Sequence, residues 1–76
     1  MSIISSTKLK IIKELKENPL HGYALAKKLG ITISSIYTHL SELEQEGFVT
    51  YTVHKRRKTY ELTEKGKKLL ELLENQ

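Results

Sequence analysis

The chain has 76 residues, the size of one small domain, and a domain of this size buries only about 60% of its unfolded surface. No cysteine is present, so disulfides and thiolate metal sites are excluded. No apolar run approaches the roughly 20 residues of a membrane span, and the polar N-terminus is too short for a signal peptide. We therefore expect a single cytoplasmic domain over residues 1–76 with no membrane association.

The net charge is +4 at pH 7, from 13 Lys and Arg against nine Glu, with no Asp. Four consecutive basic residues at 55–58 hold the whole excess, because nine basic residues face nine Glu without them. Such a cluster suits a polyanion, since each neutralised phosphate releases counterions and strengthens binding. An ordinary solvated charged loop is the alternative. The Lys and Glu bias also resembles that of heat-adapted proteins, a hint of a thermophilic source.

The first expected helix covers about residues 7–17. Its apolar stripe recurs at helical spacing and consists of Ile4, Ile11, Ile12 and Leu15. Asn18 should end the helix, because the residue before Pro19 is disfavoured in the α region.

A second, shorter helix is expected at about residues 22–29. Its candidate core positions are Tyr23, Leu25, Ala26 and Leu29. Gly30 then suits a left-handed helix terminus, and Thr32 can cap a third helix over about residues 33–46. Two helices joined by a short turn that contains glycine predict a helix-turn-helix.

After Gly47 the periodicity changes to two, and residues 48–53 and 58–62 read as strands of a hairpin with residues 54–57 as its loop. Thr63 should cap a last helix. That helix carries four leucines, Leu69, Leu70, Leu72 and Leu73. The expected fold class is α+β, mostly α: a winged helix-turn-helix of three helices, a two-stranded β-hairpin wing and a C-terminal helix.

The third helix divides into two faces at about 100° per residue. Its inward face should hold Ile33, Ile36, Leu40 and Leu43. Its outer face and cap are small and hydroxylic early on, which lets a helix N-terminus enter a major groove with its Glu residues further away. The candidate DNA-reading residues are Thr32, Ser34, Ser35, Tyr37, Thr38 and Ser41.

Several of these residues allow a second reading. Ser and Thr discriminate base edges weakly, and the face could be an ordinary solvated one. Tyr37 sits at its border, where it either covers the core or contacts a phosphate, and we favour the phosphate. Lys27 and Lys28 are possible phosphate contacts or simply exposed lysines.

The hairpin tip gives a second set of candidates. The wing residues expected on DNA are His54, Lys55, Arg56, Arg57 and Lys58. The two arginines suit a narrow minor groove, whereas the lysines suit phosphates.

Three local segments resemble PadR-type transcriptional regulators. Residues 18–25, NPLHGYAL, are similar to the segment that opens that family's second helix. Residues 34–37, SSIY, with Leu40, Leu43 and Gly47 downstream, resemble its recognition helix, and residues 57–66, RKTYELTEKG, resemble its wing strand and following helix. The matches span about residues 9–70.

The resemblance implies that Ser34, Ser35 and Tyr37 lie at the DNA surface and that the basic tip is the wing. It makes residues 21–23, HGY, mainly architectural. Thr38 departs from the family, which usually has proline there. The chain ends at Gln76, where family members typically continue into a helical domain for dimerisation and small-molecule sensing, so no small-molecule ligand is predicted.

The sequence therefore predicts a sequence-selective regulator that binds double-stranded DNA. A winged-helix module that binds only proteins is the alternative, and RNA binding ranks third. An enzyme, a metal site or a cofactor is not expected, because Asp and Cys are absent and the three His lie in different elements. A homodimer through the C-terminal helix is favoured, and a monomer stays open.

Overall fold

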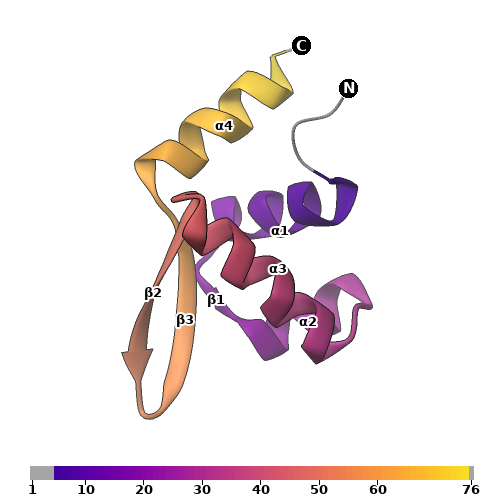
Figure 1. Ribbon diagram of the computed structural model, residues 1–76, viewed down its shortest axis with the longest axis vertical. Helices are drawn as coiled ribbons and strands as arrows, with labels where there is room; N and C mark the ends of the chain where they lie inside the picture. Colours follow the sequence, from indigo (N-terminus) through magenta and orange to yellow (C-terminus); the bar gives the residue numbers. More distant parts are fainter. Residues whose placement is uncertain (1–4, 76) are drawn as a thin grey trace.

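The computed structural model describes residues 5–75 and confirms the expected winged helix-turn-helix (Figure 1). Its elements in chain order are α1 Ser6–Glu17, β1 Leu20–His21, α2 Gly22–Leu29, α3 Ile33–Gln45, β2 Val49–His54, β3 Arg57–Leu62 and α4 Glu64–Glu74. The predicted boundaries hold to within one or two residues. No helix in the described residues is both long and apolar enough to cross a membrane.

Side-chain caps explain where three of the helices begin. Thr32 accepts a hydrogen bond from the Ser35 amide at 3.2 Å and Thr63 accepts one from the Gly66 amide at 3.1 Å, so both predicted caps are confirmed. Ser5 caps α1 in the same way, which starts that helix one residue earlier than expected. Gly30 ends α2 at φ 66°, the left-handed conformation that favours glycine.

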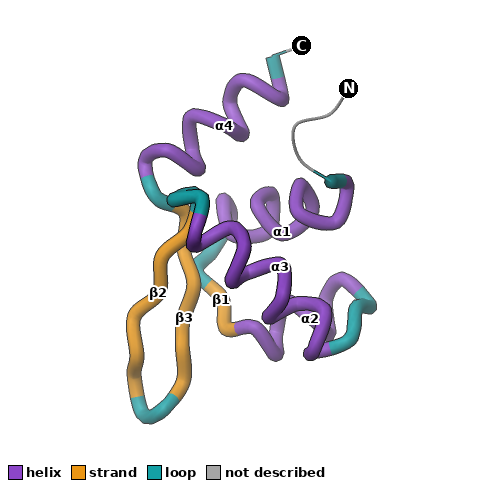
Figure 2. The backbone as a smooth tube through the Cα atoms, viewed as in Figure 1, coloured by secondary structure: helices purple, strands orange, loops and turns teal. Residues whose placement is uncertain are grey.

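The sheet has three antiparallel strands in the order β1-β3-β2, so it contains one strand more than the predicted two-stranded wing, which is confirmed as β2 and β3. The extra strand, β1, has two residues and pairs Leu20 with Tyr60 and His21 with Thr59. The predicted hairpin is present, but its loop is shorter than expected. His54 pairs directly with Arg57, which leaves a two-residue turn at the tip (Figure 2).

One apolar core joins the four helices to the base of the sheet. It consists of Ile11, Ile12, Leu15, Leu25, Ala26, Ile36, Leu40, Leu43, Val49, Tyr60, Leu62, Leu69 and Leu70. The predicted stripe on α1 is confirmed for its described members, and Ile4 lies outside the described residues.

Two predicted core positions were wrong: Tyr23 is 60% exposed and Ile33 is 47% exposed. Both lie in the first turn of their helix. Helical periodicity sets the direction of such a side chain, but it does not decide whether another element reaches far enough to cover it.

A tight joint fixes the wing relative to α3. The Thr63 hydroxyl donates to the Gly47 carbonyl at 2.6 Å, and the Thr63 amide donates to the Phe48 carbonyl at 3.1 Å. Gly66 packs so closely against the Phe48 carbonyl oxygen that a Cβ would collide with it. The joint lies where the chain passes from α3 to β2 and from β3 to α4. It therefore fixes the angle between the wing and α3.

Candidate nucleic-acid interface

The start of α2, the first half of α3 and the wing enclose one open groove of about 600 Å³. Its described lining residues are His21, Tyr23, Tyr37, Arg56, Arg57 and Lys58. The first turns of α2 and α3 and the wing tip all lie toward the lower end of the molecule in Figure 1. Four of the sequence-predicted site residues therefore come together across this groove, three from the wing and Tyr37 from α3.

Tyr37 is held at the groove by a glycine. A Cβ on Gly22 would lie 2.5 Å from Cζ of Tyr37, so a larger residue at position 22 would push the ring away from the start of α2. The ring centroid lies 6.4 Å from that of buried Tyr60, yet Tyr37 is still 40% exposed. The ring therefore packs on the core and keeps a solvent-exposed surface at the groove, and the phosphate contact stays a prediction.

The wing tip adopts an unusual backbone for its residues. Lys55 and Arg56 have φ of 50° and 68° between the paired residues His54 and Arg57, the combination typical of a type I′ turn. Such turns favour Asn-Gly because other residues are strained at positive φ. Two long cations occupy these positions instead.

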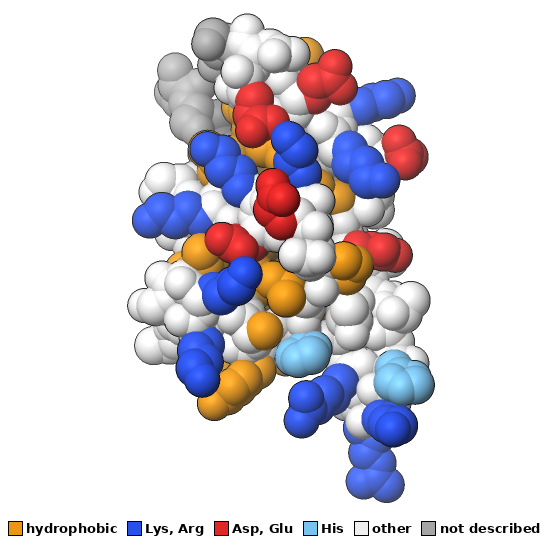
Figure 3. All heavy atoms as spheres, turned by 180° about the vertical axis from the view of Figure 1, so that it is seen from behind, with side chains coloured by type: hydrophobic (Ala, Val, Ile, Leu, Met, Phe, Trp, Pro, Cys, Tyr) orange, Lys and Arg blue, Asp and Glu red, His pale blue; other side chains and the backbone are white. Residues whose placement is uncertain are grey.

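The basic residues of the wing point to solvent rather than to carboxylates. Residues 54–58 are all exposed, and within the described chain none of the four cations at 55–58 forms an ion pair. Lys58 Nζ instead lies 4.4 Å from the centre of the Tyr51 ring, a cation–π contact within the wing. Seen from behind, the wing end of the molecule shows Lys, Arg and His side chains, and the acidic side chains on that face lie higher (Figure 3).

The outer face of α3 is exposed, but its hydroxyls differ in availability. Ser34 and Ser41 are exposed and have no side-chain hydrogen bond among the described residues. Thr38 donates to the Ser34 carbonyl at 3.0 Å, and Thr32 accepts from the Ser35 amide as the cap. Ser35 is half-buried.

The acidic residues late in α3 are partly neutralised by α1. Lys8 Nζ lies 3.2 Å from Glu42 Oε1 and 4.0 Å from Glu46 Oε1.

Lys28 pairs with Glu14 at 3.3 Å, which occupies one of the two lysines considered for phosphate contact. Lys27 is exposed and forms no ion pair within residues 5–75.

His21 and Tyr23 line the groove, although the sequence reading treated them as architectural. Gly22 between them lies directly against the Tyr37 ring. The signal that would have found His21 is β1, because its pairing with β3 places His21 opposite Thr59, beside Lys58. A two-residue strand leaves no trace in hydrophobic periodicity.

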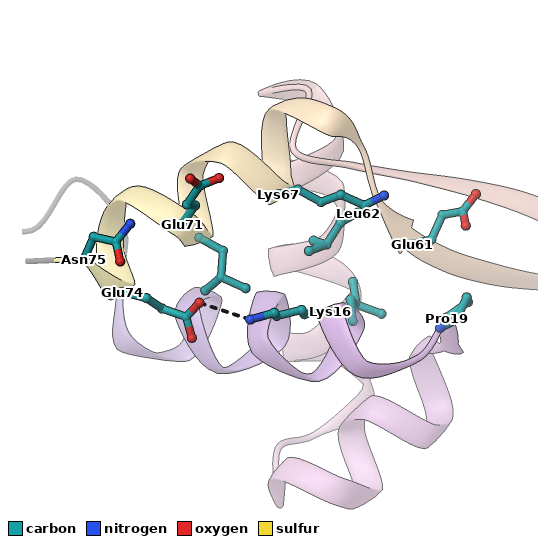
Figure 4. A pocket seen from close by; sticks show the side chains of 10 residues that line it. Lys16, Pro19, Glu61, Leu62, Lys67, Glu71, Glu74 and Asn75 are labelled. Atoms are coloured by element: carbon teal, nitrogen blue, oxygen red, sulfur yellow. Dashed lines mark hydrogen bonds and ion pairs between the residues drawn. The ribbon is translucent and has the colours of Figure 1, made fainter.

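A second groove of about 480 Å³ lies at the other end, between α1, β3 and α4 (Figure 4). Its rim mixes both charges: Glu61, Glu71 and Glu74 stand with Lys16 and Lys67, and Lys16 pairs with Glu74 at 3.2 Å. A polyanion has no reason to enter it, so the groove at the wing is the candidate interface.

Comparison with known proteins adds a family and a fold. The model of the "Transcriptional regulator PadR-like family" matches residues 11–72. No curated protein sequence matches the chain. Among solved structures, a mutant of MepR from S. aureus bound to an oligodeoxyribonucleotide is 26% identical, with a TM-score of 0.90 over 95% of this chain and 56% of that chain.

Two further structures share the fold at lower identity. The adhesin competence repressor AdcR from Streptococcus pyogenes is 23% identical, with a TM-score of 0.87 over 92% of this chain and 55% of that chain. A mutant of ZitR from Lactococcus lactis is 20% identical, with a TM-score of 0.89 over 99% of this chain and 53% of that chain. The chain thus spans little more than half the length of these proteins.

Proposed function

The chain belongs to the PadR-like family of transcriptional regulators, and from that premise we propose that it binds double-stranded DNA sequence-selectively. In this proposal α3 enters the major groove and the wing engages the adjacent minor groove or its phosphates. The observation that carries it is the groove at the wing, where Tyr37 faces three cations and no described lining residue is acidic. The family and the fold are those of transcription regulators rather than enzymes.

The proposed contacts divide by chemistry. Ser34 and Ser41 are the base-edge readers, because they are exposed with uncommitted hydroxyls. The Tyr37 hydroxyl binds phosphate. Among the remaining hydroxylic candidates, the Thr32 and Thr38 side chains already make local hydrogen bonds, and Ser35 is half-buried.

The wing contributes most of the affinity and little sequence reading. Arg56 and Arg57 enter the minor groove, where narrow A·T-rich stretches concentrate negative potential. His54, Lys55 and Lys58 bind phosphates, and Lys27 adds a further contact from α2. The structure of MepR with an oligodeoxyribonucleotide supports this use of the fold.

Binding to a mixed-sequence duplex at several salt concentrations tests the proposal. We expect log affinity to fall against log salt with a slope of about −3 or steeper, at about 0.9 per neutralised phosphate. Absence of binding at low salt, or binding that ignores salt, contradicts it and favours the module that binds only proteins.

We further propose that residues 1–76 act as one domain and pair as a homodimer through α4. Leu72 on α4 is 68% exposed, beyond what the core of one copy covers. Two linked half-sites give a small reader affinity and specificity that one lacks. Selection of bound duplexes from a random pool decides this, because a dimer selects a palindrome and a monomer selects a single half-site.

A further inference from the structure

His21 occupies a position in the groove that its backbone role does not explain. It is the N-cap residue of α2, but its side chain makes no capping hydrogen bond, unlike the caps of α1, α3 and α4. Its backbone belongs to β1, opposite Thr59 of β3. The half-buried imidazole is therefore uncommitted to the cap and lines the groove.

The other described residues that line this groove are cationic or phenolic. Arg56, Arg57 and Lys58 come from the wing, and the Tyr23 and Tyr37 hydroxyls come from α2 and α3. No described lining residue is a carboxylate. A positive charge added to the empty groove meets repulsion from the three cations, whereas a phosphate in the groove reverses the sign of the local potential.

We propose that the groove holds a backbone phosphate of one DNA strand and that His21 takes up a proton when the strand binds. The proton comes from solvent and adds to the neutral imidazole, and the resulting imidazolium donates a hydrogen bond to a phosphate oxygen. The Tyr23 hydroxyl, 60% exposed at the groove, donates a second one. Histidine suits this role because its charge changes between about pH 5 and 8.

This inference rests on the proposed DNA binding. It adds the place where one DNA strand lies and a dependence of binding on pH. The three cations fix where the strand lies and stay charged at neutral pH. In this proposal the proton on His21 adds a positive charge beside the DNA strand, so binding at this place becomes stronger as pH falls.

Isothermal titration calorimetry of the whole chain with a mixed-sequence duplex counts the proton directly. At one pH and ionic strength, buffers with different ionisation enthalpies give heats that differ by the number of protons bound. We expect an uptake between zero and one proton per chain near pH 7, and binding up to about tenfold weaker at pH 8 than at pH 6.

Three histidine variants test which imidazole takes up the proton. His21→Gln should remove the uptake and the pH dependence. His39→Gln is the matched control and should keep both, because His39 lies outside the groove with Nδ1 3.9 Å from Glu42 on α3. His54→Gln removes a proposed phosphate contact of the wing, so it should weaken binding while most of the uptake persists. Inorganic phosphate in place of the duplex should give no comparable binding at millimolar concentration.

The proposal is overturned if the wild-type chain binds the duplex with no proton uptake, a result that needs no variant to fold. It is also overturned if the uptake survives in His21→Gln or disappears in His54→Gln. Phosphate alone binding with the same uptake would assign a free-anion site instead. In each of these cases salt-dependent DNA binding remains, whereas failure of the proposed function itself appears as no duplex binding at any pH.

Discussion

Tyr60 is the residue through which α3 and the wing share one core. It is 4% exposed, and its ring centroid lies 6.4 Å from that of Tyr37 on α3 and 5.5 Å from that of Tyr51 on β2. Burial raises the pKa of the Tyr60 hydroxyl above its usual value, and the nearby charges of Tyr37, Glu44 and Tyr51 raise it further. The buried position of Tyr60 therefore favours the neutral phenol.

This raised pKa predicts a loss of stability in alkali. Above about pH 10 the unfolded chain releases the Tyr60 proton before the folded chain does, so the free energy of unfolding falls as pH rises toward the folded-state pKa. Denaturant unfolding between pH 8 and 11 should show a shallower fall for Tyr60→Phe than for wild type. Tyr23→Phe removes an exposed phenol and should follow wild type; equal profiles for all three proteins would contradict the assignment.

At the scale of elements, the wing turn places two cationic residues at positions where the backbone is strained. Non-glycine residues at positive φ cost about 1 kcal/mol or more each, and Lys55 and Arg56 both adopt it. Asn-Gly would fit a type I′ turn with less strain. The sequence places two cations there instead, which is reasonable if the tip binds a polyanion.

Replacing the two turn residues separates the effect of backbone strain on stability from the effect of charge on DNA binding. Lys55→Asn with Arg56→Gly should raise Tm by several degrees, since about 1 kcal/mol corresponds to roughly 4–8 °C in a domain of this size. It should also lower the salt slope of DNA binding by about 2, at about 0.9 per phosphate contact. The matched variant Lys55→Ala with Arg56→Ala loses the same charge but keeps the positive φ.

Comparing the two double variants also defines the results that would contradict this interpretation of the turn. The alanine pair should lose the same slope without the gain in Tm. If the Asn-Gly pair gains no stability over the alanine pair, the turn stores no strain. If both pairs keep the wild-type slope, the turn does not touch phosphate.

The sequence predicted the helices, the hairpin and two helix caps, but it did not predict the long-range pairing of β1 with β3. Caps at Thr32 and Thr63 and the change of period after Gly47 are local signals, and the structure confirms all three. The groove depends on β1, whose two residues pair with a strand almost 40 positions later, and no local pattern reports that pairing. His21 and Tyr23 were therefore not recognised as site residues.

At the scale of the whole molecule, the two ends differ in the charge of their side chains. The groove between α1, β3 and α4 has a mixed rim with an internal ion pair, and the wing end has cations without described carboxylate partners. Glu42 of α3 and its C-cap residue Glu46 pair with Lys8 of α1. One end of the molecule is thus suited to a strand of DNA, and the body stays close to neutral.

The most direct test of this account compares the salt dependence of duplex binding for two fourfold alanine variants. Replacement of residues 55–58 should flatten the slope of log affinity against log salt by about three. Replacement of Lys10, Lys13, Lys67 and Lys68, which carry the same charge but line no part of the groove at the wing, should leave the slope close to wild type. An unchanged slope in the wing variant, or an equal loss in both, would contradict the claim that the wing and α3 form the DNA-binding surface.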